Sequence, residues 1–324
     1  MRTRSFTVAV AIALSGALVA CGSDDKSSTS SNGSAATKQS SSAPVKLGLI
    51  TKFPVDFYLA MKSAAQKWDT ANQGATVTYG TGKSATDDQG QIDLIQSMVT
   101  QGVKGIAITP SSPAVAPALD AAVAKGVKVV LLDNDLPDWK KKSSVVATDN
   151  LKGGVLAGQY LAKSLKQGAT VAVLEGVPGV PALDDRVKGM EQGLGSSGIK
   201  VVGKAPTDCD QDKGVSAAAD LLTAHPKVDA IYGACGPPTL GAIQSIQRAG
   251  RQPDGILLVG FDALPDEVKQ IEAGKEDATV AQFPAKMGEL GLGTLLRAVK
   301  GENVAPTVDT GTAIVSKDNA SDFG

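Results

Sequence analysis

Short apolar runs alternate with amphipathic helical stretches along most of the chain, and this alternation limits the fold more than any other feature. In the first half the apolar runs fall at residues 45–50, 75–79, 105–108, 127–132 and 145–147, with helical patterns at 55–72, 88–100 and 114–125. Strands that are apolar throughout and separated by helices are typical of parallel sheets covered on both faces. The sequence therefore predicts an α/β fold.

The same alternation begins again after residue 147. Strands are expected at 169–174, 199–202, 230–232, 256–259 and 278–282, and helices at 151–165, 182–196, 212–224, 239–249, 265–273 and 284–299, followed by a short tail. We therefore expect two doubly wound parallel-sheet lobes of similar size. The groove between them is the expected ligand site.

Residues 144–154 connect the two series and contain a polar turn. The turn, Thr148-Asp149-Asn150, follows a strand and can cap the helix that comes next. We expect Gly153 and Gly154 to let that helix pack closely against the sheet. The stretch is therefore expected to act as a hinge crossing that also lines the ligand site.

Polar groups recur at the ends of the predicted strands. They are Thr109-Pro110-Ser111-Ser112, Asp133-Asn134-Asp135, the turn at 148–150, Phe261-Asp262 and Gln282. Each one alone is also explained as an ordinary turn or helix cap. Their recurrence at five strand ends indicates a polar ligand cleft, because such ends converge in this type of fold.

Composition and motifs exclude several other classes. A formal net charge of -1 and few aromatic residues provide no electrostatic footprint for nucleic acid. The first strand is not followed by Gly-x-Gly-x-x-Gly, which disfavours a dinucleotide site. The polar residues contain no nucleophile paired with a base and no His and Cys cluster, so we expect neither an enzyme nor a metal or cofactor.

The N-terminus has the pattern of an export signal. Within residues 1–20, Arg2 and Arg4 precede a largely apolar run from Phe6 to Ala17, and the segment ends Leu18-Val19-Ala20-Cys21. This ending resembles the lipobox of bacterial lipoproteins, which implies a lipid on Cys21; the alternative is an ordinary secretory signal. Residues 21–44 read as a disordered tether, because 22–43 contain nine serines and no large apolar residue. The protein is thus expected to be lipid-anchored outside the cytoplasm.

Two further cysteines, Cys209 and Cys235, remain in a chain exported to an oxidising compartment. We expect them to form a disulfide, which would close about 25 residues and stabilise the fold by roughly 3–4 kcal/mol. Two buried free thiols are the alternative. A catalytic thiol is disfavoured, because the chain's single histidine, His225, lies in a polar turn.

Several motifs resemble those of the ribose-binding-like solute-binding proteins of ABC importers. They are 145–150 with Gly153-Gly154 and Ala157-Gly158, Asp185-Arg186-Val187-Lys188-Gly189-Met190, Leu240-Gly241-Ala242, Val259-Gly260-Phe261-Asp262 and Ala281-Gln282-Phe283-Pro284. The resemblance implies the type I periplasmic binding protein fold, with three crossings near Thr148, Gln282 and Pro306. The lobes would then be 45–147 plus 283–306 and 148–282 plus 307–324.

The resemblance also implies a ligand set for a monosaccharide or polyol. It comprises Thr51, Phe57, Tyr58, Thr109, Asp133, Thr148, Arg186, Phe261, Asp262 and Gln282, to which Lys52 and Asp56 are added because residues 52–56 replace a polar turn of the family. The carboxylates would accept hydroxyl protons, Arg186 would donate, and the aromatic rings would cover the sugar's C–H faces. The alternatives are core packing for the aromatic residues and a surface ion pair with Asp184 or Asp185 for Arg186.

The second lobe departs from the family pattern at both cysteines. Asp208-Cys209-Asp210 stands where ribose binders have an aromatic residue, and 234–238 stands where they have Asn-Asp. A disulfide there would replace an aromatic wall and an amide, so ribose is not inferred as the ligand. The implied partner is an ABC importer permease, and we expect a monomer. A sensor that signals to a chemoreceptor or sensor kinase is the alternative.

Overall fold

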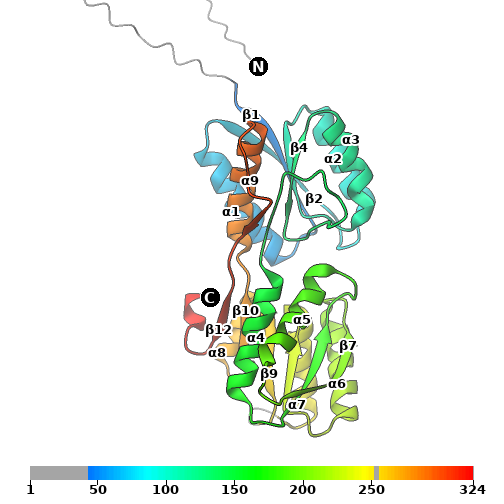
Figure 1. The fold of residues 1–324 in the computed structure, drawn as a ribbon, viewed down its shortest axis with the longest axis vertical. Helices are drawn as coiled ribbons and strands as arrows, with labels where there is room; N and C mark the ends of the chain where they lie inside the picture. Colours follow the sequence, from blue (N-terminus) through cyan, green and yellow to red (C-terminus); the bar gives the residue numbers. More distant parts are fainter. Residues whose placement is uncertain (1–42, 252–254, 324) are drawn as a thin grey trace, which may run out of the picture. The chain divides into compact units, whose positions relative to one another are not determined.

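The computed structural model describes residues 43–251 and 255–323. The expected export signal, Cys21 and all but the last two residues of the expected tether lie outside this part. Within it, no helix is long and apolar enough to cross a membrane. The described residues form two six-stranded sheets, each with helices on both faces (Figure 1).

The first lobe is built on the sheet with strand order β11-β5-β4-β3-β1-β2, in which all neighbours are parallel. Its strands are β1 (Val45–Thr51), β2 (Ala75–Thr81), β3 (Gly105–Ile108), β4 (Lys128–Leu132), β5 (Ser144–Ala147) and β11 (Thr307–Asp309). Helices α1 (Asp56–Ala71) and α9 (Pro284–Val299) share one core cluster. The other core cluster is shared by α2 (Asp88–Thr100) and α3 (Ala116–Ala124), and the 3-10 turn η1 (Pro113–Val115) precedes α3. Figure 1 shows α9, from late in the chain, beside α1.

The second lobe is built on the sheet with strand order β12-β10-β9-β8-β6-β7. Its strands are β6 (Thr170–Glu175), β7 (Lys200–Pro206), β8 (Ala230–Gly233), β9 (Leu257–Asp262), β10 (Ala278–Ala281) and the antiparallel β12 (Ala313–Ser316). Helices α4 (Asn150–Ser164) and α5 (Pro181–Leu194) pack into one cluster, and α6 (Gln211–Ala224) and α7 (Gly236–Arg248) into another. Helix α8 (Pro265–Glu272) and the 3-10 turn η2 (Ala320–Asp322) complete the lobe. The predicted fold class is confirmed.

The C-terminal tail is more ordered than the sequence indicated. It contains β11, which joins the first sheet beside β5, and β12, which joins the second beside β10. The third crossing therefore follows Asp309, a few residues later than the position expected near Pro306. The sequence pattern missed β11 because the strand has only three residues, of which two are exposed.

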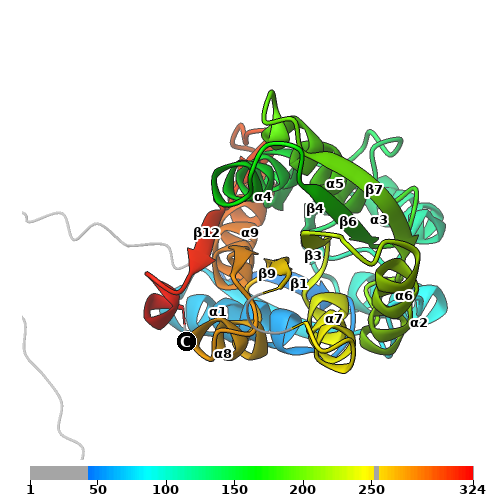
Figure 2. The same cartoon turned by 90° about the horizontal axis from the view of Figure 1, so that it is seen from below.

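Helices α4 and α5 approach each other backbone to backbone, and Figure 2 shows them side by side. A Cβ atom built on Gly154 would lie 2.2 Å from the carbonyl oxygen of Arg186, and one on Gly189 would lie 2.2 Å from that of Leu151. Gly153 instead faces the sheet, where a Cβ would lie 2.7 Å from the ring of Phe261. The expected close packing on the sheet thus holds for Gly153, whereas Gly154 serves the contact with α5.

Candidate functional site

Arg186, on the first turns of α5, is the centre of the polar groups in the second lobe. Its side chain is buried, and Nε donates to Oδ1 of Asn150 at 2.8 Å. Nη1 donates to the carbonyl oxygen of Ala234 at 2.9 Å and to Oδ1 of Asp262 at 3.0 Å. The alternative of a surface ion pair with a neighbouring aspartate is therefore wrong. The α4–α5 contact fixes Arg186, because Asn150 begins α4.

Asp262 holds this arginine from the end of β9. Its Oδ1 also accepts from Nε2 of Gln282 at 2.6 Å, and its Oδ2 accepts from the backbone amide of Gly236 at 3.0 Å. Gly236 is the first residue of α7, so the carboxylate lies at a helix N-terminus, which favours negative charge. We call Arg186, Asp262 and Gln282 the second-lobe centre. Three protein donors already satisfy Asp262, which makes it an organiser of the centre.

Phe261 lies beneath this group as part of the core. Its side chain is fully buried, and its ring centroid lies 4.0 Å from the guanidinium carbon of Arg186. A cation stacked on an aromatic face is stabilised by the charge distribution of the ring. The structure thus places Phe261 behind Arg186, as a support for the guanidinium.

The first-lobe centre consists of Asp133, Tyr58 and Lys52. Asp133 follows β4 with a φ of 60°, and its Oδ2 accepts from the hydroxyl of Tyr58 at 2.9 Å. Phe53 and Phe57 pack edge-on against the Tyr58 ring, with centroids 5.4 Å and 5.2 Å away. This aromatic cluster fixes the tyrosine that orients the buried carboxylate.

The charges of the two centres act on one another. Burial raises the pKa of Asp133, and the charge of Arg186, the Tyr58 hydrogen bond and the charge of Lys52 oppose that rise. Burial lowers the pKa of Lys52, while Asp133 and Asp88 raise it. Carboxylates and cations from both lobes therefore converge, as the polar strand ends had indicated.

The predicted threonines divide into two kinds. Thr51 and Thr109 are buried with internal partners: Oγ1 of Thr51 lies 2.9 Å from Oγ1 of Thr81, and Oγ1 of Thr109 donates to Sδ of Met61 at 3.8 Å. These two hydroxyls therefore already have partners within the first lobe. Thr148 differs, because its buried Oγ1 has no hydrogen-bond partner among the described residues.

The remaining predicted residues lie at the start of α1. Asp56 is exposed in the first turn of the helix, and Phe57 is half-buried beside Tyr58. The charge of Asp56 reaches Lys269 of α8, whose pKa it raises together with the stronger effect of Asp266. Asp56 thus lies on an exposed edge, apart from the buried carboxylate of Asp133.

Sequence reasoning missed several contributors. Phe53 packs on Tyr58, Asn150 holds Arg186, and Asp88 accepts from Oγ of Ser111 and Ser112 at 2.6 Å and 2.8 Å. Asn150 and the serines were already visible as strand-end polar residues, but their partners depend on which helices pack together. The backbone groups of residues 234 and 236 had no sequence signal.

The expected disulfide between Cys209 and Cys235 is present, with 5.5 Å between the Cα atoms. Cys235 is buried at the N-cap of α7, between two residues whose backbone binds the second-lobe centre. Among the described residues, no group of three or more His, Cys, Asp or Glu side chains is arranged to hold a metal ion.

Two glutamates are buried behind Asp262. Glu267 accepts from the backbone amide of Leu264 at 2.8 Å and from Oγ1 of Thr279 at 2.9 Å, whereas both carboxylate oxygens of Glu276 lack a donor among the described residues. Burial raises the pKa of both carboxyl groups; the charge of Asp262 adds to the rise at Glu267, and the charge of Glu267 adds to the rise at Glu276. A proton on Glu276, donated to Glu267, gives one Glu276 oxygen a partner and avoids two negative charges side by side.

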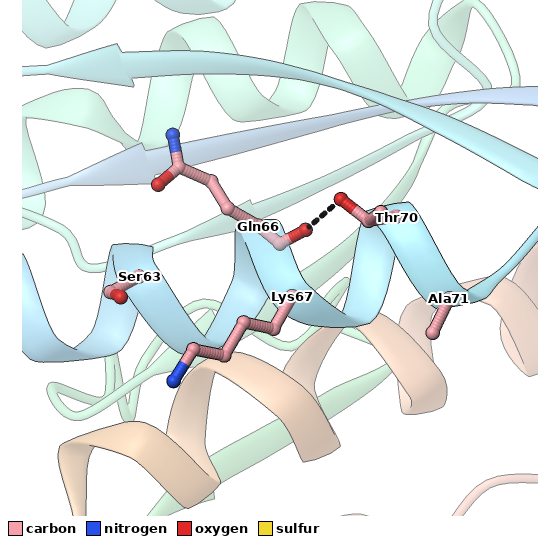
Figure 3. Close-up of a pocket in the computed structure, with 5 residues that line it drawn as sticks. All are labelled: Ser63, Gln66, Lys67, Thr70 and Ala71. Carbon is pink, nitrogen blue, oxygen red and sulfur yellow. Dashed lines mark hydrogen bonds between the residues drawn. The ribbon is translucent and has the colours of Figure 1, made fainter.

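A separate surface hollow lies on α1, shown in Figure 3. It is lined by Ser63, Gln66, Lys67, Thr70 and Ala71, all of them exposed. Lys67 is its only charged lining residue, and the hydroxyl of Thr70 donates to the backbone of Gln66. It has none of the convergent buried polar groups of the two centres, so the centres remain the candidate site.

Comparison with known proteins gives consistent matches. Residues 47–303 match the family model described as periplasmic binding protein domain. The ribose import binding protein of Escherichia coli is 33% identical over 250 residues, which cover 76% of this chain and 82% of that protein.

Two solved structures are similar over nearly their whole length. A periplasmic ribose ABC transporter from Conexibacter woesei has a TM-score of 0.80 and 26% identity, covering 87% of this chain and 95% of that one. An ABC transporter solute-binding protein from Burkholderia graminis, in complex with D-arabinose, has a TM-score of 0.77 and 29% identity, covering 86% and 97%.

Proposed function

This chain belongs to the periplasmic binding protein family, and we propose that it captures a monosaccharide or polyol outside the cytoplasm for delivery to an ABC importer. The observation that carries the proposal is the convergence of the two centres, with Asp133 and Lys52 from one lobe and Arg186 and Asp262 from the other. Relatives whose names specify ribose, and a neighbour that holds D-arabinose, support the same class of ligand.

Three unpartnered buried atoms favour a ligand with several hydroxyl groups. They are Oγ1 of Thr148, Oε1 of Gln282 and Oγ1 of Thr310, which lie where the chain passes between the lobes. A buried polar atom without a partner costs roughly 1–3 kcal/mol, so a ligand that hydrogen-bonds to it gains that amount. Adjacent hydroxyl groups can donate to one acceptor and accept from Arg186, as sugars and polyols do.

The proposed mechanism is binding by hinge closure, without chemical turnover. Ligand hydroxyls that bridge Asp133 in one lobe to Arg186 in the other stabilise a closed arrangement of the lobes. Micromolar affinity requires about 8 kcal/mol net. Arg186 is already held by Asn150, Ala234 and Asp262, so little side-chain entropy is lost on binding.

Anchoring and delivery complete the proposal. A lipid on Cys21 would keep the protein at the outer face of the cytoplasmic membrane, and the serine-rich tether would set its reach to the permease. The protein would work as a monomer. Cys21→Ser should release it from membranes into the soluble fraction and abolish labelling by radioactive palmitate; persistent membrane association and labelling would contradict the anchor.

A thermal-shift screen over pentoses, hexoses, tetritols, pentitols and inositols tests the function. A ligand at 100 times its Kd stabilises by about 2.7 kcal/mol, which corresponds to a rise in Tm of about 5 °C or more. Arg186→Lys keeps the charge but loses the planar fork, so it should remove most of that rise. Lys67→Ala, in the surface hollow on α1, is the matched control and should retain it. If no compound of these classes raises Tm, the proposal is wrong.

A further inference from the structure

The Cys209–Cys235 disulfide holds the backbone segment that binds both members of the buried ion pair. The carbonyl of Ala234 accepts from Arg186 at 2.9 Å, and the amide of Gly236 donates to Asp262 at 3.0 Å. Cys235 lies between these two residues and is 1% exposed. A displacement of Cys235 would therefore disturb Arg186 and Asp262 together.

The other end of the disulfide is fixed to a different part of the second lobe. Thr207 is tied to the end of β6, because its Oγ1 donates to the carbonyl oxygen of Glu175 at 2.6 Å. Asp210 caps α6 by accepting from the amide of Lys213 at 2.9 Å. Cys209 lies between these two attachments, so the disulfide links residues 234–236 to the edge of the sheet.

The backbone around Cys209 is held in a conformation that side chains disfavour. Asp208 and Cys209 have φ values of 53° and 55°, in the left-handed region that favours glycine. Non-glycine residues remain there only where their surroundings determine the conformation, and such residues cluster at functional sites. The turn is thus a rigid anchor for the disulfide.

We propose that this disulfide is a positioning element of the ligand site, which fixes residues 234–236 so that Arg186 and Asp262 are held ready for the ligand. The proposal rests on the function proposed above and extends it, since it makes ligand affinity depend on the oxidation state of two cysteines. A disulfide that only restricted the unfolded chain would lower stability on removal and leave the folded site unchanged. The two roles therefore differ in what happens to Arg186 in the folded protein.

The first test needs no ligand. Hydrogen exchange is followed by NMR at the Arg186 Nε–H and the Gly236 amide in the wild type, in a Cys209→Ser/Cys235→Ser double variant, and in Leu221→Ala. Leu221 is buried in α6, so that variant lowers the Tm of the same lobe without altering residues 234–236. The double variant should exchange at least tenfold faster at both groups than a control of comparable Tm; equal rates would overturn the proposal.

A second route avoids variants that fail to fold. Dithiothreitol applied to the folded wild type transfers two electrons and two protons to the disulfide, which leaves two thiols and a cyclic dithiothreitol disulfide. Cys209 is partly exposed and offers the point of attack. The same tenfold acceleration at Arg186 and Gly236 is expected after reduction, and unchanged exchange would refute the positioning role.

The third measurement separates this inference from the proposed function. D-ribose, D-allose, D-arabinose, glycerol and myo-inositol are titrated calorimetrically into the oxidised wild type and the double variant. For any compound that binds the wild type, Kd should rise at least tenfold in the double variant, and a change below twofold would overturn the proposal. If none of these compounds binds the wild type, that result contradicts the proposed binding function for these compounds. The positioning role is then decided by the exchange rates alone.

Discussion

Adding a single methyl group between α4 and α5 should destabilise the second lobe. A Cβ on Gly158 would lie 2.1 Å from the carbonyl oxygen of Met190 and 2.8 Å from Cα of Gly193, whereas ordinary contact begins near 3.4 Å. The obstacle is backbone, which has no rotamer that moves it aside. Gly158→Ala can be accommodated only if the helices separate by about 1 Å along much of their contact.

The magnitude follows from two opposing effects. Overpacking of a tight contact costs about 1–3 kcal/mol, and the clash with backbone places this site at the upper end. Replacing glycine by alanine inside a helix stabilises the folded protein by about 0.5–1 kcal/mol, which offsets part of that cost. The net loss should be about 2 kcal/mol, or a fall in Tm of about 4–8 °C.

Gly293→Ala in α9 is the matched control. It is the same substitution inside a helix, but the atom nearest to the added Cβ, Nε1 of Trp68, is 3.9 Å away. Helix propensity then dominates, so the free energy of unfolding should rise by about 0.5–1 kcal/mol. Urea denaturation followed by circular dichroism measures both variants. If Gly158→Ala proved as stable as the wild type, the close α4–α5 contact would be wrong.

Three further results are expected. The pKa values of Glu267 and Glu276 are raised above their ordinary value of 4.5, so above that pH the folded protein binds more protons than the unfolded chain. The contribution of this pair to the free energy of unfolding is therefore largest below pH 4.5 and is lost as pH rises. Glu276→Gln should flatten this decline by up to about 1.4 kcal/mol per pH unit in urea titrations between pH 5 and 8; an unchanged slope would exclude the shared proton. Asp262→Ala should lower stability by about 3 kcal/mol as well as abolish ligand binding, because it removes the charged partner of buried Arg186. If chemical denaturation gave this variant the same free energy of unfolding as the wild type, the ion pair would be misassigned. Tyr58→Phe should weaken sugar binding about tenfold in calorimetry and lower stability by about 1–3 kcal/mol, since the ring still packs but buried Asp133 loses its hydroxyl donor. Unaltered affinity would place the first-lobe centre away from the ligand.

The sequence by itself determined the order and type of nearly all elements. Most strands of the two sheets are short apolar runs and the helices have one apolar face, because burial between layers imposes those periods locally. Asp133 was also identifiable, since it directly follows a buried strand. The turn at 148–150 had a local signal as well, and Asp149 does cap α4 by accepting from the amide of Lys152.

Only the tertiary structure decided where the polar side chains of the strand ends lead. Thr109 and Asp133 both follow apolar strands. The Thr109 hydroxyl donates to Met61 inside the core, whereas the Asp133 carboxylate accepts from Tyr58. The difference arises from the left-handed backbone at Asp133 and from the helices that cover each strand. Local sequence contains neither the neighbour nor the direction of the side chain.

The same holds for Arg186, whose role depends on contacts far apart in the chain. Its partners come from the start of α4, the end of β8 and the end of β9, up to 76 residues away. The tail strand β11 likewise exists only because it pairs with β5, some 160 residues earlier. The hydrophobic pattern of the sequence indicates whether a residue is buried. The residue that a buried side chain contacts is fixed only when the sheets and their helices are assembled.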